Sequence, residues 1–168
     1  MNRRRLATAA IVVAVLAPLG GLLWFESGIR ARQAQRPEVG AMFPALPGFA
    51  DGETLPAAPG RLRVVTFARA GCGNCDRTIT ALRRMARTEG PTFDLIAVVA
   101  GSGSPELDGD GVHAAIADPD GAVSRRFGVV HVPLVFLVDE QSRILAVSTG
   151  ERPDTAWRSF LESGSDAL

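Results

Sequence analysis

The feature that most constrains the fold is a β-rich apolar run that leads through a glycine into two cysteines and an amphipathic helix. The run covers residues 62–68, the glycine is Gly71, and the cysteines are Cys72 and Cys75, the only two in the chain. A disulfide that closes so short a loop restricts little of the unfolded chain and is a weak structural crosslink. The spacing therefore favours thiol–disulfide chemistry.

The rest of the chain alternates between strand-like and helix-like segments. The periodicity of apolar residues predicts further helices and strands in addition to the strand over 62–68. The expected helices are 76–87, 122–127 and 154–161, and the expected strands are 93–100, 129–138 and 144–148, with short extended pieces at 46–49, 53–55 and 114–116. The order β-α-β-α-β-β-α implies an α/β fold with a central mixed β-sheet flanked by helices.

The sequence predicts an export signal at the N-terminus. Three arginines precede an uncharged run over residues 6–25, about the 20 residues that a membrane-spanning helix needs. We predict a signal anchor in residues 1–25, a tether in 26–38 and a folded domain in 39–168. A cleaved signal peptide is the alternative, and both interpretations export the domain.

The position of the two cysteines makes them chemically unequal. Cys72 is expected at a helix N-terminus, where unpaired backbone N–H groups and the helix dipole stabilise a thiolate over a thiol. Cys72 is therefore the candidate nucleophile. Cys75 is expected one turn further into the helix and less accessible, so it is the candidate resolving thiol.

Pro133 lies inside the strongly β-like run 129–138. A proline cannot donate to a sheet ladder, so it normally marks an edge strand or the end of a strand. One interpretation is an edge-strand proline. The other is a Val132–Pro133 cis peptide in a loop that lies against the cysteines.

Two segments resemble the thioredoxin-fold proteins. Residues 64–75 are similar to their strand and active-site turn, and residues 127–139 are similar to the segment that carries their cis-proline. The chain most resembles the membrane-anchored TlpA/ResA/CcmG-like branch, over about residues 39–161. The resemblance implies a thioredoxin fold with Cys72 as nucleophile, Cys75 as resolving thiol and Val132–Pro133 as the substrate-side loop.

The chain departs from this family at three positions. Gly71 stands where the family usually has a tryptophan before the first cysteine. Thr66 occupies the position of the buried acid of thioredoxins, and Thr78 that of a ResA-type glutamate. The groups that usually manage the proton of Cys75 are therefore absent.

The resemblance implies an extracytoplasmic thiol–disulfide oxidoreductase, a dedicated reductant of protein clients in cytochrome c maturation or in assembly of another thiol-containing enzyme. Its electrons would come from a membrane donor protein, with no cofactor and no metal site. A single-pass anchor in the cytoplasmic membrane would place the domain on the periplasmic side, where disulfides are managed.

One different function stays open. Two thiolates with His113 or His131 suit Cu(I), so a copper chaperone on the same scaffold is the alternative. Nucleic-acid binding is not expected, because 18 basic and 18 acidic residues give a net charge of zero and no basic face.

Overall fold

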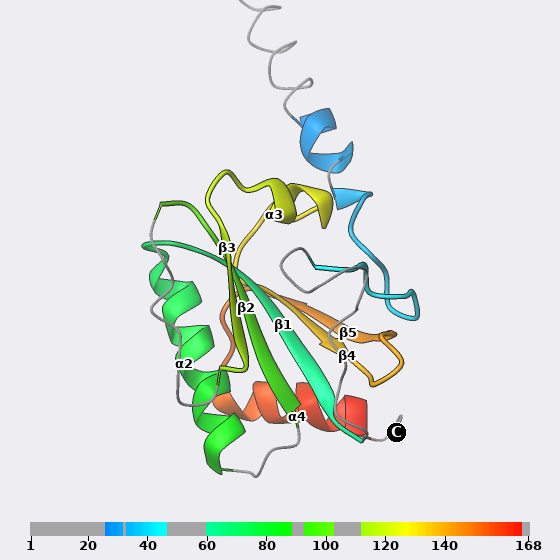
Figure 1. Ribbon diagram of the computed structural model, residues 1–168, viewed down its shortest axis with the longest axis vertical. Coiled ribbons are helices and arrows are strands. Elements are labelled where there is room, and N and C mark those ends of the chain that lie inside the picture. Colours follow the sequence, from blue (N-terminus) through cyan, green and yellow to red (C-terminus); the bar gives the residue numbers. More distant parts are fainter. Residues whose placement is uncertain (1–25, 32, 47–59, 89–92, 103–111, 166–168) are drawn as a thin grey trace, which may run out of the picture.

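The computed structural model describes residues 26–31, 33–46, 60–88, 93–102 and 112–165. Within these ranges a five-stranded sheet is packed between helices (Figure 1). The strands are β1 Leu62–Arg69, β2 Phe93–Ala100, β3 Ala114–Asp118, β4 Leu134–Val138 and β5 Ile144–Thr149. The helices around the sheet are α2 Gly73–Thr88, α3 Ala122–Arg126 and α4 Asp154–Ser165.

The sheet is mixed, and its order is β3-β2-β1-β4-β5. β1 and β3 both pair in parallel with β2, whereas β4 is antiparallel to both β1 and β5. β1 is the central strand and is buried from Leu62 to Ala68, as a nearly continuous apolar run predicts for a strand covered on both faces. The predicted α/β fold with a mixed sheet and flanking helices is confirmed.

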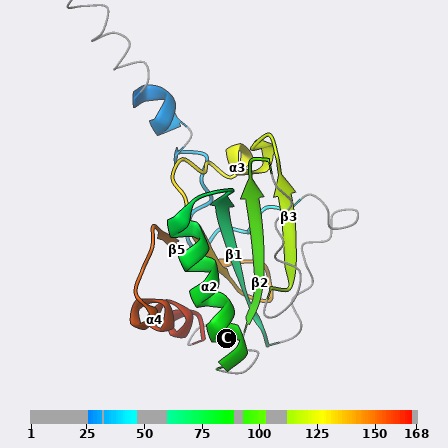
Figure 2. The ribbon, with the colours of Figure 1, turned by 90° about the vertical axis from the view of Figure 1, so that its left-hand side faces the viewer.

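The two faces of the sheet hold separate cores. Leu62 and Val64 pack with α2 and α4, which lie on one side of the sheet (Figure 2). Val65 and Phe67 point to the other face, where they pack with residues beside α3 and with the segment before β1. Because side chains alternate along a strand, the even-numbered residues of β1 face α2 and the odd-numbered residues face α3.

Several element boundaries differ from the sequence prediction. The expected strand 129–138 begins only at Leu134, because Pro133 has no N–H for the ladder. α2 begins at Gly73 and already includes Cys75. β3 is a full strand that runs to Asp118, and α4 continues beyond 161 to Ser165.

Some predicted features cannot be compared. The predicted anchor in residues 1–25 and nearly all of the extended pieces in 46–55 lie outside the described residues. Among the helices of the described part of the chain, none has the length and apolar character needed to cross a bilayer.

A buried arginine forms hydrogen bonds to the turn between β4 and β5. Arg63 is 4% exposed, and its Nη2 donates to the Asp139 carbonyl at 2.8 Å and to Ser142 Oγ at 2.9 Å. Burial lowers the pKa of Arg63, while the nearby charges of Asp139 and Asp94 oppose that change. The sequence prediction counted Arg63 within an apolar run and did not anticipate its role in holding this turn.

Asp118 at the end of β3 organises the start of α3. Its carboxylate accepts hydrogen bonds from the amides of Val123 and Ser124 and, at 2.7 Å, from the Ser124 hydroxyl. Burial acts to raise the pKa of Asp118, but the bonds from Ser124 and Val123 and the charge of Arg125 outweigh it, so the pKa is lowered. The ionised form is therefore the one that stabilises the fold.

Replacing Asp118 with asparagine is expected to cost roughly 1–2 kcal/mol of unfolding free energy at pH 7. The folded pKa lies below the unfolded value of about 3.9. The contribution is therefore present above that pH and disappears as the pH falls through the folded pKa. Urea unfolding of wild type and Asp118→Asn should show a difference that shrinks below about pH 4.

Asp120→Asn is the matched control, because Asp120 makes its bond to the Ala122 amide at an exposed position. It is expected to have a smaller effect. A deficit for Asp118→Asn that stays constant between neutral and acid pH would contradict this account of Asp118.

Candidate active site

The two cysteines form a disulfide at the start of α2. Cys72 immediately precedes the helix, and its carbonyl accepts the first helical hydrogen bond from the Asp76 amide at 3.0 Å. The Cys72 sulfur itself accepts a hydrogen bond from the Cys75 amide at 3.3 Å. The helix N-terminus thus donates to the sulfur of Cys72, an arrangement that stabilises negative charge there once the disulfide is opened.

The two sulfurs differ in their access to solvent. Cys75 is fully buried, in a cluster with Ala68, Ile79, Ala97 and Val99. Cys72 is only partly buried and packs on the outside of that cluster. An incoming sulfur can therefore reach Cys72 but not Cys75.

Gly71 makes the turn that connects β1 to this helix. Its φ is +73°, in the left-handed region that residues other than glycine adopt only with strain. The glycine at this position, where the resembling family usually has a tryptophan, therefore has a local structural reason. A tryptophan here would require a different backbone conformation between Ala70 and Cys72.

The Val132–Pro133 segment lies beside the cysteines. The peptide bond between these residues is cis. Val132 packs on the buried cluster that contains Cys75, and Pro133 is buried and accepts a hydrogen bond from the Gly150 amide at 2.8 Å. The structure thus brings together the four residues that the sequence singled out, from two segments about 60 positions apart.

A charged contact next to the cysteines was missed by the sequence reasoning. Arg77 in the second turn of α2 forms a two-pronged ion pair with Glu151, with N–O distances of 2.7 and 2.8 Å, and also donates to Asn74 at 2.6 Å. The bond to Glu151 raises the pKa of Arg77, and the bond from Arg77 lowers the pKa of Glu151. The contact ties the start of α2 to the loop after β5. Because Arg77 and Glu151 are 74 positions apart, no local sequence pattern predicts this ion pair.

The two histidines differ in their position. His131 is exposed, two residues before Pro133. His113 lies 3.7 Å from Asp94, whose side chain is on the α3-facing side of β2 and so across the sheet from Cys75. Among the described residues, no group of three or more His, Cys, Asp or Glu side chains is placed to hold a metal ion.

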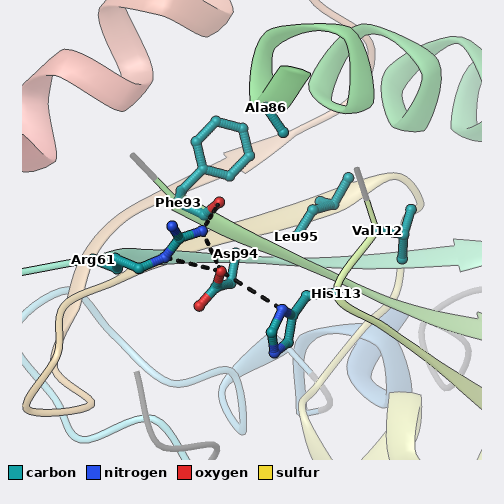
Figure 3. A pocket seen from close by; sticks show the side chains of 7 residues that line it. All are labelled: Arg61, Ala86, Phe93, Asp94, Leu95, Val112 and His113. Carbon is teal, nitrogen blue, oxygen red and sulfur yellow. Dashed lines mark hydrogen bonds and ion pairs between the residues drawn. The ribbon is translucent and has the colours of Figure 1, made fainter. Parts of the chain in front are cut away.

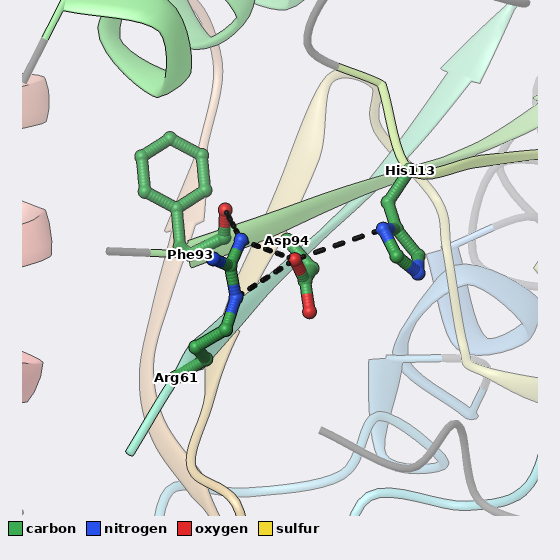
Figure 4. A network of polar contacts seen from close by, with 4 residues as sticks. All are labelled: Arg61, Phe93, Asp94 and His113. Carbon is green, nitrogen blue, oxygen red and sulfur yellow. Dashed lines mark hydrogen bonds and ion pairs between the residues drawn. The ribbon is translucent and has the colours of Figure 1, made fainter. Parts of the chain in front are cut away.

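Asp94 and His113 also line a cavity of about 240 Å³ at the start of β2 (Figure 3). The Asp94 carboxylate sits between Arg61, which donates to it at 3.1 and 2.5 Å, and His113 (Figure 4). Arg61 also donates to the Phe93 carbonyl at 3.2 Å. These contacts satisfy the buried carboxylate and tie the approach to β1 to the start of β2.

Comparisons with known proteins identify the fold. No family model matches the chain, and no curated protein matches it. A solved structure of a candidate thiol:disulfide interchange protein DsbE from Chlorobium tepidum is 24% identical, with a TM-score of 0.55 over 76% of this chain and 96% of its own.

Two further structures give the same result. A thioredoxin-like protein of uncharacterised function from Porphyromonas gingivalis is 24% identical, with a TM-score of 0.54 over 77% of this chain and 90% of its own. StoA from Bacillus subtilis is 14% identical, with a TM-score of 0.50 over 76% and 99%. The chain therefore has the thioredoxin fold.

Proposed function

We propose that this protein is an enzyme, a thiol–disulfide oxidoreductase that exchanges the Cys72–Cys75 disulfide and dithiol with protein clients. The observation that carries the proposal is one disulfide that joins an accessible sulfur at a helix N-terminus to a fully buried one. This asymmetry serves no purpose in a structural crosslink. It is what sequential attack and resolution require. The names of similar solved structures, such as thiol:disulfide interchange protein, agree with it.

In the reducing direction the chemistry proceeds in two exchanges. The Cys72 thiolate attacks one sulfur of a client disulfide, and the other client sulfur leaves as a thiolate. Cys75 then loses its proton and attacks the Cys72 sulfur, which breaks the mixed disulfide and releases the second client thiolate. The client gains two electrons and two protons, and the protein ends as the Cys72–Cys75 disulfide.

Val132 and Pro133 are proposed to bind the client chain. Sheet pairing of β4 starts at Leu134, so the backbone just before it stands outside the ladder beside Cys72. An extended client segment can pair with backbone at such a position, which is a form of β-strand addition. This would align a client disulfide with the attacking sulfur.

We further propose that the protein acts as a reductant outside the cytoplasm, anchored by residues 6–25 and supplied with electrons by a membrane protein. The uncharged run that follows three arginines supports the anchor. Labelling of reduced Cys72 by a membrane-impermeant maleimide in intact spheroplasts tests the location. Labelling only after lysis would place the domain in the cytoplasm instead.

The activity itself is tested with the full chain purified in detergent. The reduced protein is expected to reduce insulin disulfides at the expense of dithiothreitol, and its disulfide is expected to equilibrate with glutathione. A reduction potential near −120 mV, the oxidising end of the range for this fold of about −270 to −120 mV, would contradict the reductant role but not the exchange activity. Absence of any exchange would contradict the enzyme proposal.

A further inference from the structure

Buried hydroxyl groups without hydrogen-bond partners mark the interior next to the active-site disulfide. Among the residues that the structure describes, Thr66 and Thr78 are 0% and 1% exposed, and the Oγ1 atom of each has no partner. A buried hydroxyl without a partner is costly, so each such group calls for an explanation. Neither threonine has a role in the fold as described above.

Thr78 lies on the same face of α2 as Cys75. The two residues are three positions apart, and both belong to the buried face of the helix. Helical side chains lean toward the N-terminus of their helix, so the Thr78 side chain leans toward Cys75.

Thr66 approaches the same place from the sheet. It is an even-numbered residue of β1 and therefore faces α2, between Val64 and Ala68. Its partner in register on β2 is Ala97, and both Ala68 and Ala97 pack in the cluster that contains Cys75. The two alanines are small, so the Thr66 side chain extends further from the sheet than either of them.

Within the described part of the chain, the surroundings of Cys75 offer its sulfur no ionisable partner. The described side chains that face it from β1, β2 and the inner side of α2 are apolar except for the two threonines. The charged residues of this region, Arg69, Asp76 and Arg77, are exposed. Asp94 is on the opposite face of the sheet.

We propose that the hydroxyl groups of Thr66 and Thr78, here called the hydroxyl pair, form hydrogen bonds with the sulfur of Cys75 when the disulfide is reduced. In the disulfide form Cys75 is held toward Cys72, and both hydroxyls lack a partner. Once the S–S bond opens, the side chain can turn about its Cα–Cβ bond, and its sulfur can exchange hydrogen bonds with the hydroxyls. The pair thus favours the dithiol over the disulfide. The inference rests on the proposed function.

The test is the equilibrium of the full chain with glutathione. Two glutathione thiols give two electrons and two protons to the protein, the Cys72–Cys75 bond breaks, two S–H bonds form, and glutathione disulfide is released. Thr66→Val and Thr78→Val keep the shape of the side chain and remove the hydroxyl. Each is expected to shift the equilibrium toward the protein disulfide by roughly fivefold.

The matched controls separate hydroxyl chemistry from packing. Thr66→Ser and Thr78→Ser keep the hydroxyl and should retain the wild-type equilibrium. Ser148 on β5 also carries a buried hydroxyl without a partner, on the same face and two strands from Thr66. Ser148→Ala should leave the equilibrium unchanged, because Ser148 is roughly 10 Å from Thr66 across the sheet.

A second measurement keeps the test valid if one variant folds poorly. Each threonine-to-valine change should lower the unfolding free energy of the dithiol form more than it lowers that of the disulfide form, each measured against the same form of wild type. Valine variants with the wild-type equilibrium, or an equal shift in Ser148→Ala, would overturn the hydroxyl pair. If wild type itself fails to exchange with glutathione, the proposed function falls instead.

Discussion

Replacing Cys72 with serine is expected to reduce thiol–disulfide exchange to the uncatalysed background. Cys72 is the partly exposed sulfur of the pair, and its sulfur is the one that receives a hydrogen bond at the helix N-terminus. A serine hydroxyl is not ionised at neutral pH and cannot attack a disulfide, and Cys75 is too deeply buried to substitute for Cys72. Insulin reduction with dithiothreitol, measured on the purified full chain, checks this expectation.

Cys75→Ser is the matched control and should fail in a different way. Cys72 can still attack, but nothing resolves the mixed disulfide, so a covalent adduct with the client accumulates. Mass spectrometry should find the adduct in Cys75→Ser, absent in Cys72→Ser, and released by excess dithiothreitol. Adducts in Cys72→Ser instead would reverse the assigned roles of the two cysteines.

The largest loss of stability is expected from Trp157→Ala. Trp157 in α4 is fully buried and packs edge-on against Phe160, with ring centroids 5.6 Å apart. Its removal leaves a large cavity between α4 and the sheet, and we expect a cost of about 3–5 kcal/mol in the free energy of unfolding. Urea titration of the disulfide form, followed by circular dichroism, measures that cost.

Trp157→Phe distinguishes lost volume from lost hydrogen bonding. The indole Nε1 is buried and has no partner among the described residues, so removing the N–H sacrifices no hydrogen bond. Phenylalanine keeps a six-membered ring and leaves a smaller cavity, so its cost should be clearly lower than that of alanine. Equal losses for the two variants would show that the indole N–H, and not the filled volume, stabilises α4.

Local sequence patterns were sufficient for the type and chain order of most helices and strands and for the position of the cysteines at the start of a helix. The run from Leu62 is long, apolar and β-branched, and α2 repeats its buried residues at spacings of three and four. Pro133 could be recognised because a proline inside a β-like run contradicts its surroundings. These signals lie within a few residues of the feature that they predict.

Contacts between distant segments could not be predicted in this way. Arg77 and Glu151 each look like an ordinary exposed charge until the fold brings them together. Arg63 looks like the exposed interruption of an apolar strand, yet it is buried, and its Nη2 donates hydrogen bonds to the turn that contains Asp139. Thr66 and Thr78 were noted only for the acids that they replace, and their lack of partners became visible only in three dimensions.

The segment before β1 determines how far this chain can be shortened. Phe43 packs against Phe127 and Phe136, with ring centroids 5.0 and 5.4 Å away, and Leu46 shares that core. The backbone of this segment also bonds to the β4–β5 hairpin, from Gly40 to Ile144 and from Phe43 to Ser142. A truncated protein for expression should therefore begin before Gly40. A protein that starts at β1 would expose the apolar surface that Phe43 and Leu46 cover, and exposed apolar surface promotes aggregation.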